Sequence, residues 1–392
     1  MVRTNRSILE AQYENLTHWA NAIGYHIVPI LRRCLRFLAL PYCYSNINWD
    51  ICTRSRVGVW LDFLYIFFVL KYYPDNYSPC RLWEKPRSEW KYYYGSNYDP
   101  YQRKKLQRVV QPPEYEILFK DKWITDALCQ HANIPTPSIL GKIKPSEPFQ
   151  ERVDELFNLH QNLSELIIKP VDGKGGGGVV YCQRQDAKIR YLQGQTEIDL
   201  KGVLSERNYI VQSFIQQHPA ITRISGSTNT VRIVTLLQDN DEVLVIGAYM
   251  RFGTGQSKVD NLSQGGLCVP IDPKKGKLRQ TGSDRKSRLY FEHPDSKIMF
   301  EGVEVPFWEN VVDLASDVQR YFECYRLLGM DIAIAEDGPL LIEINSSYDN
   351  VDLEQATGPI LRSEPVVKAY SQLDLLINRH QRDILDEYGV TQ

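Results

Sequence analysis

The fold of this chain is decided by the stretch Gly329-Met-Asp-Ile-Ala-Ile-Ala-Glu-Asp-Gly-Pro-Leu-Leu-Ile-Glu-Ile-Asn345. Its two apolar runs meet at Asp337-Gly338, a dipeptide typical of a tight turn between antiparallel strands. Asp331 lies on the first expected strand. Glu343 and Asn345 stand two residues apart on the second, so their side chains point to the same face of the predicted hairpin.

These three oxygen-bearing side chains predict a metal site. A carboxylate between apolar neighbours, such as Glu343 between Ile342 and Ile344, is costly to bury unless a cation compensates it. Oxygen ligands suit a hard cation, and Mg²⁺ fits best because it commonly takes phosphate oxygens as further ligands. We therefore expect Asp331, Glu343 and Asn345 to bind Mg²⁺. An ordinary surface hairpin is the alternative.

Working outward, the next motif is Ile167-Ile-Lys-Pro-Val-Asp-Gly-Lys-Gly-Gly-Gly-Gly-Val179. Glycines let the backbone approach a ligand closely, and successive N–H groups can then line a phosphate. The motif is not a Walker A loop, because no Gly-Lys-Ser/Thr follows to open a helix. It is not a dinucleotide fingerprint either, because the chain continues as a strand. The alternative is a flexible hairpin tip. The glycines concerned are Gly173, Gly175, Gly176, Gly177 and Gly178.

The remaining pattern predicts a mixture of strands and helices, which implies an α/β or α+β domain. Apolar spacing favours one helix over Lys120–His131 and a long amphipathic helix over Pro306–Leu328. Strands are expected over Glu165–Lys169, Tyr209–Phe214, Thr230–Leu237, Val243–Met250 and Leu340–Ile344.

As an ordered set, these motifs resemble the ATP-grasp superfamily. The resemblance includes Asn229-Thr-Val-Arg-Ile-Val-Thr235 and Val259-Asp-Asn-Leu-Ser-Gln-Gly-Gly266, and it covers roughly residues 114–360. More narrowly, the chain is similar to the sugar-transfer-associated ATP-grasp group, related to RimK-type and glutamate-ligase-like proteins. The resemblance implies an α+β fold in which two lobes grip ATP.

The expected organisation has three domains. Residues 1–113, which end at Gln111-Pro-Pro113, are expected to form a mainly helical domain. Residues 114–215 would form the small lobe with the glycine-rich loop and hinge. Residues 216–392 would form the large lobe with the Mg²⁺ site and a C-terminal helix. The first segment has 16 basic and 8 acidic residues and 22 of the 44 aromatic residues. It is either an aromatic core with solvated cations or a surface for a substrate or an acidic or sugar-like partner.

The resemblance also implies a nucleotide site. Lys122 and Lys169 match the two phosphate-binding lysines of the family, and Tyr209–Ile215 resembles the hinge strand that meets adenine. Gln212 stands where relatives often carry glutamate. The backbone at Ser213, Phe214 and Ile215 would meet the adenine edge, and Gln217 or His218 would reach the ribose.

The resemblance further places polar residues beside the transferring phosphoryl group. Arg232, and as a second candidate Arg251, would contact the γ-phosphate or a substrate carboxylate, since a guanidinium matches both. Asn261, Gly265 and Gly266 lie in the loop that relatives use beside the metal. For each of these side chains a solvated strand or turn residue is the alternative.

The function implied is an ATP-dependent carboxylate–amine ligase that forms an amide bond through an acylphosphate. The partners would be ATP, Mg²⁺ and small carboxylate and amine substrates, such as an amino acid and a sugar-linked acceptor in exopolysaccharide assembly. The alternatives are an ATP-grasp kinase or enol-activating enzyme, and a nucleotide-binding partner protein without turnover. The sequence leaves a homodimer open.

Composition excludes several other classes. A formal charge of −2 argues against a general nucleic-acid binder. Eight cysteines without a Cys-x-x-Cys pair argue against a disulfide scaffold or zinc site and favour a reducing, cytoplasmic location. The most apolar run, Val57–Leu70, is interrupted by Asp62. It is also too short to span a membrane, since a membrane-spanning helix needs about 20 apolar residues. We expect a buried helix there, with peripheral contact at a membrane surface as the alternative.

Overall fold

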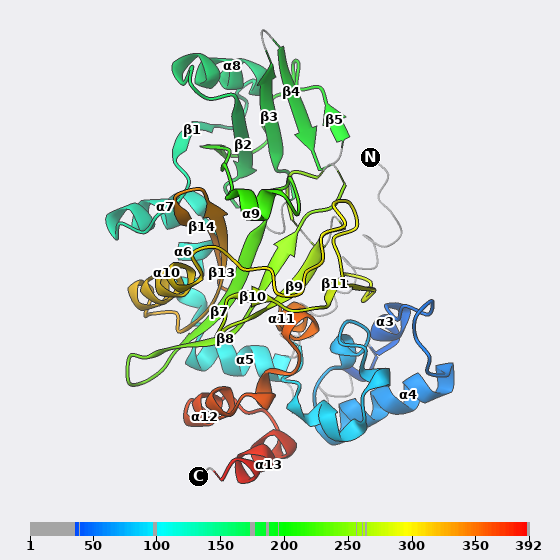
Figure 1. Ribbon diagram of the computed structural model, residues 1–392. Helices are drawn as coiled ribbons and strands as arrows, with labels where there is room; N and C mark the ends of the chain where they lie inside the picture. The colour runs from blue at the N-terminus through cyan, green and yellow to red at the C-terminus, as the bar shows by residue number, and fades with distance from the viewer. Residues whose placement is uncertain are drawn as a thin grey trace. The chain divides into compact units, whose positions relative to one another are not determined.

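The computed structural model describes residues 36–38, 40–96, 100–172, 177–185, 188–194, 196–255, 257–260, 262 and 265–389. The chain divides into two compact units (Figure 1). Unit 1 comprises Met1–Val109 together with Asp349–Gln392, and unit 2 comprises Val110–Tyr348.

Unit 1 is built from helices and short turns. Its N-terminal part contains α3 (Leu40–Ser45), α4 (Arg56–Tyr65), a π-helical turn (Ile66–Leu70), 3-10 turns at Pro74–Asn76, Leu82–Glu84 and Arg87–Tyr92, and α5 (Pro100–Val109). Its C-terminal part contains α11 (Asn350–Thr357), a 3-10 turn (Ile360–Arg362), α12 (Glu364–Gln372) and α13 (Arg379–Glu387). Aromatic rings dominate its core, including Phe63, Tyr77 and Trp90.

The two sequence segments of unit 1 are joined by polar contacts. The Tyr94 backbone N–H donates to Glu354 Oε1 (2.7 Å), and the Tyr94 hydroxyl donates to the Leu375 carbonyl (2.8 Å). Lys105 pairs with Asp374 at 3.0 Å. The structure therefore groups residues 349–389 with the N-terminal unit, whereas the sequence prediction assigned them to the large lobe. The division into three domains remains a prediction.

The first sheet of unit 2 has six antiparallel strands in the order β1-β6-β2-β3-β4-β5. Its strands are β1 (Ile139–Ile143), β2 (Glu165–Pro170), β3 (Val180–Gln185), β4 (Lys188–Gln193), β5 (Thr196–Ile198) and β6 (Tyr209–Ser213). Helix α8 (Phe149–Leu159) packs on this sheet, and its Val153 and Phe157 share a core with Ile168 of β2. Helices α6 (Ile117–Lys120) and α7 (Lys122–His131) precede β1, after a 3-10 turn at Pro113–Tyr115.

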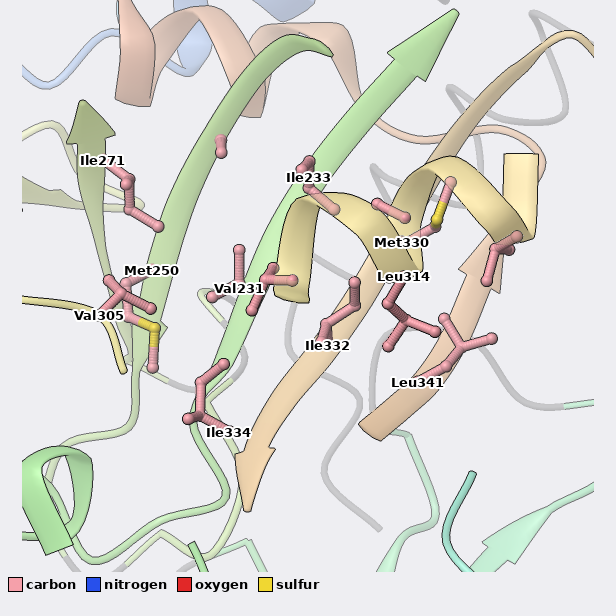
Figure 2. Packing of buried hydrophobic residues seen from close by; sticks show 14 of the residues in the cluster. Val231, Ile233, Met250, Ile271, Val305, Leu314, Met330, Ile332, Ile334 and Leu341 are labelled. Carbon is pink, nitrogen blue, oxygen red and sulfur yellow. The ribbon is translucent and has the colours of Figure 1, made fainter. Parts of the chain in front are cut away.

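The second sheet of unit 2 is also antiparallel, with the order β12-β11-β9-β8-β7-β13-β14 and β10 paired to β9. Helix α10 (Trp308–Tyr321) covers one face, and Figure 2 shows its Leu314 beside Met330 and Ile332. The strands are β7 (Thr230–Leu237), β8 (Val243–Phe252), β9 (Leu267–Asp272), β10 (Lys277–Leu278), β11 (Gly282–Asp284), β12 (Leu289–Tyr290), β13 (Leu327–Ala335) and β14 (Gly338–Asn345), with α9 (Pro219–Thr222) preceding β7.

Two predicted boundaries are wrong in this sheet. The helix expected over Pro306–Leu328 ends at Tyr321, because Gln319 donates to the Tyr325 carbonyl (3.0 Å) and the chain turns into β13 at Leu327. The hairpin turn lies at residues 336–337 and not at Asp337-Gly338, because Ala335 pairs with Gly338. The hairpin itself is as predicted.

Candidate functional site

Unit 2 contains a cavity lined by both of its sheets. The second sheet contributes residues from β7, β8, β13 and β14, and the first contributes residues from β2 and β6. Most of the side chains predicted from sequence meet here. They are Lys122, Lys169, Gly177, Gln212, Ser213, Ile215, Arg232, Arg251, Asp331, Glu343 and Asn345.

The hairpin of β13 and β14 places the three predicted metal ligands together. Asp331 lies directly opposite Glu343 in the strand register, and a register shift follows between Asp331 and Ile332. Asn345 Nδ2 lies 3.4 Å from Asp331 Oδ2. The converging donors therefore follow from strand pairing, as the sequence pattern suggested.

Two arginines from the neighbouring strands hold Asp331. Arg232 Nη2 donates to Asp331 Oδ2 at 3.0 Å, and Arg251 Nη2 approaches the same oxygen at 2.8 Å. Burial by itself would raise the pKa of Asp331, but the attraction of Arg232 and Arg251 outweighs burial and lowers this pKa to about 2. The carboxylate thus stays charged although its side chain is almost inaccessible.

Two lysines approach the same cavity from the other side. Asp121 caps the start of α7 by accepting N–H groups, and the Lys122 backbone N–H donates to the Val171 carbonyl (3.1 Å), just beyond β2. Lys122 Nζ lies 3.1 Å from Glu343 Oε1. Burial lowers the pKa of Lys169 to about 8, while the charge of Glu343 opposes this shift.

Asp260 and Thr230 belong to the site but were missed by the sequence analysis. Asp260 Oδ2 accepts hydrogen bonds from the Thr230 backbone N–H (2.8 Å) and hydroxyl (2.6 Å), and Arg251 Nη2 donates to that hydroxyl (2.7 Å). Both residues line the cavity. Burial raises the pKa of Asp260, and Arg251 opposes the shift. Both residues lie in stretches that carry the family resemblance, but the sequence analysis gave neither a role. Asp260 is brought to the site by its contacts with Thr230 and Arg251 and by the bridge between Val259 and Thr228.

The hinge residues lie partly in the cavity. Gln212 Nε2 donates to the Pro137 carbonyl (3.1 Å), and Ser213 and Ile215 line the cavity wall. Phe214 lies outside the lining, because its ring packs edge-on against Tyr181 with centroids 5.2 Å apart.

The predicted ribose contacts have structural partners instead. His218 begins α9, where its Nδ1 accepts the Ala220 N–H (3.1 Å), and it lies outside the cavity lining. Gln217 is held by Asn229, whose N–H donates to Gln217 Oε1 at 2.9 Å. Neither side chain is therefore positioned in the cavity as the resemblance implied.

The loop predictions are only partly covered by the described residues. Gly177 lines the cavity, and Gly178 has a φ of +76° with Pro170 only 3.1 Å from the position a Cβ would take. Gly173, Gly175, Gly176 and Asn261 lie outside the described residues. Gly265 and Gly266 are described but do not line the cavity.

The oxygen donors of Asp331, Glu343 and Asn345 fit Mg²⁺ if a ligand or water supplies further oxygens. In the described part of the chain, no group of three or more His, Cys, Asp or Glu side chains could hold a metal ion. The hairpin offers two carboxylates and one amide, which is the oxygen chemistry that Mg²⁺ prefers, but further oxygens must come from a bound phosphate or water. Asp331 also has to share its charge between the metal and two arginines.

Sequence comparison assigns the family. Residues 101–368 match the sugar-transfer associated ATP-grasp family, and the chain therefore belongs to it. Its α+β architecture of two antiparallel sheets with flanking helices, accompanied by an aromatic-rich helical unit, is the fold predicted from the sequence. A comparison with curated proteins finds no significant match.

Several solved structures are similar at low identity. D-alanine–D-alanine ligase from Bacillus anthracis is 15% identical, with 71% of this chain and 72% of that chain covered and a TM-score of 0.37. A RimK domain ATP-grasp protein from Sphaerobacter thermophilus is 14% identical, with 69% and 72% covered and a TM-score of 0.36.

N5-carboxyaminoimidazole ribonucleotide synthetase from Thermotoga maritima is 11% identical, with 62% of this chain covered and a TM-score of 0.33. This chain spans only 49% of that enzyme's length. All of these scores are below 0.5, so the family assignment rests on the sequence match alone. Among the described residues, no helix is both long and apolar enough to cross a membrane.

Proposed function

We propose that unit 2 binds ATP with Mg²⁺ and catalyses the ATP-dependent joining of a carboxylate to an amine. The observation that carries this proposal is the meeting of four cationic side chains with three oxygen donors around one cavity. Lysine and arginine charges suit phosphate oxygens. The family assignment supports a nucleotide as the ligand.

In this proposal, the substrate carboxylate attacks the γ-phosphorus of ATP, and ADP leaves. The resulting acylphosphate is attacked at its acyl carbon by the amine, which loses a proton as inorganic phosphate leaves and the amide bond forms. Lys122, Lys169, Arg232 and Arg251 offset the charge of the phosphates. Catalysis of this kind depends mainly on positioning and charge neutralisation.

Asp331, Glu343 and Asn345 would hold Mg²⁺, which supplies charge neutralisation at the phosphate oxygens. Asp260 has a positioning role in this scheme, because it fixes Thr230, and Thr230 in turn accepts from Arg251. The adenine would lie against Ser213 and Ile215. The loop with Gly173 and Gly175 to Gly178 would shield the acylphosphate from water.

The substrates and the biological setting belong to the same proposal. We propose an amino acid and a sugar-linked acceptor, in keeping with the sugar-transfer association of the family. Unit 1 would serve as the substrate or partner domain. The seven described cysteines are free thiols, which supports a cytoplasmic location.

The most direct activity test is Glu343→Gln, which keeps the shape of the side chain and removes its charge. We expect ADP release with an amino acid and sugar acids to fall about 100-fold or more. Glu336→Gln, at the exposed hairpin tip, is the matched control, and circular dichroism checks the fold of both variants. Equal turnover of the two variants would contradict the metal assignment.

Product analysis separates the rival reactions. An amide together with free phosphate supports the ligase. A stable phosphoester would identify a kinase instead, and ATP binding without ADP release across broad substrate panels would identify a non-catalytic nucleotide-binding protein.

A further inference from the structure

Unit 1 has an exposed apolar face that its own core does not use. Helix α4 and the π-helical turn after it leave Val57, Leu61 and Phe68 with 71%, 55% and 54% of their surface exposed. Three further apolar residues are exposed: Val69 follows Phe68 in the sequence, Phe37 contacts the Phe68 ring, and Leu38 follows Phe37. We call these six residues the apolar face. Contiguous exposed apolar surface of this kind commonly marks an interaction site.

Helical geometry places these side chains on one stripe. Val57 and Leu61 are one helical turn apart, and Phe68 follows about two turns later. The opposite side of the same helix is fully buried, with Val59, Phe63 and Phe67 in the aromatic core of unit 1. The core is therefore complete without the exposed stripe.

Aromatic contacts extend the stripe into a continuous patch. The rings of Phe37 and Phe68 lie 5.9 Å apart between centroids, and Phe37 also contacts Phe67 at 6.0 Å. The residues preceding α4 thus join the same surface as the end of the helix. A π-helical turn, which is rare and frequently found at functional sites, presents Phe68 and Val69.

The exposed charges in the sequence segment that carries the apolar face, Thr53–Tyr73, are positive. Arg56 begins α4, and Lys71 follows the π-helical turn, so exposed cations flank the stripe at both ends. Between Thr53 and Tyr73 the only acidic residue is Asp62. It is buried and paired with Arg54 (3.0 Å) and Arg87 (2.7 Å).

These two arginines add partly exposed guanidinium groups along the helix. Both are 45% exposed, and the Arg87 guanidinium lies 4.9 Å from the centre of the Tyr65 ring. The exposed charges of this segment therefore have one sign. A second copy of the chain would bring the same positive charges into its own contact, whereas an anionic surface would attract them.

We propose that the apolar face of unit 1 binds the surface of an anionic lipid bilayer. Leu61, Phe68 and their neighbours would enter the boundary between headgroups and acyl chains, while Arg56 and Lys71 would contact lipid phosphates. An apolar helical stripe bordered by cations has the composition of helices that lie in the membrane interface. The partner is recognised by charge and apolarity and not by a specific headgroup.

The test is co-sedimentation of the full chain with vesicles. We expect binding to vesicles of phosphatidylcholine mixed with phosphatidylglycerol, weaker binding to phosphatidylcholine alone, and a loss of binding at high salt. The double variant Leu61→Asp with Phe68→Asp should bind about tenfold more weakly or worse. Arg56→Glu with Lys71→Glu should lose the preference for anionic vesicles.

The matched control is Leu159→Asp with Leu204→Asp, which removes two leucines of unit 2 that are 74% and 56% exposed, at least as exposed as Leu61 and Phe68. It should bind vesicles like the unmodified protein, and thermal unfolding should show that all variants remain folded. Binding that is absent, that ignores lipid charge, or that is unchanged in the Leu61 and Phe68 variant would overturn the proposal. Light scattering gives a further contradicting outcome. If the unmodified protein were a dimer that does not bind vesicles, and only the Leu61 and Phe68 variant were a monomer, the apolar face would bind a second copy of the chain.

Discussion

Two buried carboxylates, one in each unit, have pKa values shifted in opposite directions. Asp331 in unit 2 and Glu354 in unit 1 are almost equally inaccessible, at 2% and 1% exposure. Two arginines lower the pKa of Asp331 to about 2, despite burial. Burial raises the pKa of Glu354 to about 8, and the hydrogen bonds from the N–H groups of Tyr94, Ile360 and Gly95 oppose this shift only in part.

The difference between these two carboxyl groups indicates which unit is suited to bind a charged ligand. In unit 1, Glu354 has a raised pKa and accepts a hydrogen bond from the Tyr94 backbone N–H, which joins the two sequence segments of the unit. Unit 1 also buries an ionised carboxylate, Asp62, which is paired with Arg54 and Arg87. The buried ions of unit 2 differ because they line a cavity, and keeping ions of both signs there is costly unless they serve a charged ligand.

The largest expected effect is on unit 2. Asp331→Asn leaves Arg232 and Arg251 buried without their shared countercharge, and should lower the free energy of unfolding by about 3–5 kcal/mol. Denaturant titration measures this value, with Asp337→Asn in the exposed turn as the control. If the two variants were equally stable, the arginine–aspartate cluster would contribute nothing to the fold.

Lys169→Met should separate binding from stability. Loss of one charged contact to phosphate should weaken ATP binding by roughly 10- to 100-fold. The fold should not lose stability, because a buried charge with a lowered pKa is removed. Isothermal titration calorimetry and thermal unfolding report the two quantities, with the exposed Lys188→Met as the control. Unchanged ATP affinity would exclude Lys169 from the phosphate site.

The third effect concerns unit 1 and is measured as a gradual slope with pH. The folded state keeps the Glu354 proton up to about pH 8, whereas an unfolded chain releases it near pH 4.5. The contribution of Glu354 to the free energy of unfolding is therefore fully present below about pH 4.5. It is lost as pH rises toward 8, with a slope of up to about 1.4 kcal/mol per pH unit. Glu354→Gln should flatten this slope. An equal slope in both proteins would show that other groups, such as Asp349, carry it.

Local sequence patterns predicted the strands and the hairpin well. Thr230–Leu237 was predicted with the bounds that β7 has, because its long apolar run has few alternatives. Glu343 and Asn345 were expected on one face of the hairpin, but the pairing of Asp331 with Glu343 depends on the turn at residues 336–337 and on the register shift after Asp331, which the pattern did not predict. The end of α10 was missed: the helix is capped at Phe322, and Gln319 donates to the Tyr325 carbonyl beyond it, which apolar periodicity does not encode.

The rest of the site and of unit 1 depends on contacts between distant segments. Asp260 reaches the cavity because it accepts from Thr230, 30 residues earlier. The C-terminal helices join unit 1 through pairs such as Lys105 with Asp374, which are 269 residues apart. His218 shows the limit of a resemblance motif, because the side chain predicted to reach the ribose caps a short helix and lies outside the cavity lining.

The central claim is that the hairpin of β13 and β14 holds a divalent ion beside a triphosphate. Mn²⁺ accepts the same oxygen ligands as Mg²⁺, and its anomalous scattering locates it in crystals grown with a non-hydrolysable ATP analogue. We predict an anomalous peak in direct contact with the side-chain oxygens of Glu343 and Asn345 and with phosphate oxygens. A nucleotide in the cavity whose metal lies away from both side chains, or a cavity without nucleotide at saturating concentration, would contradict the account.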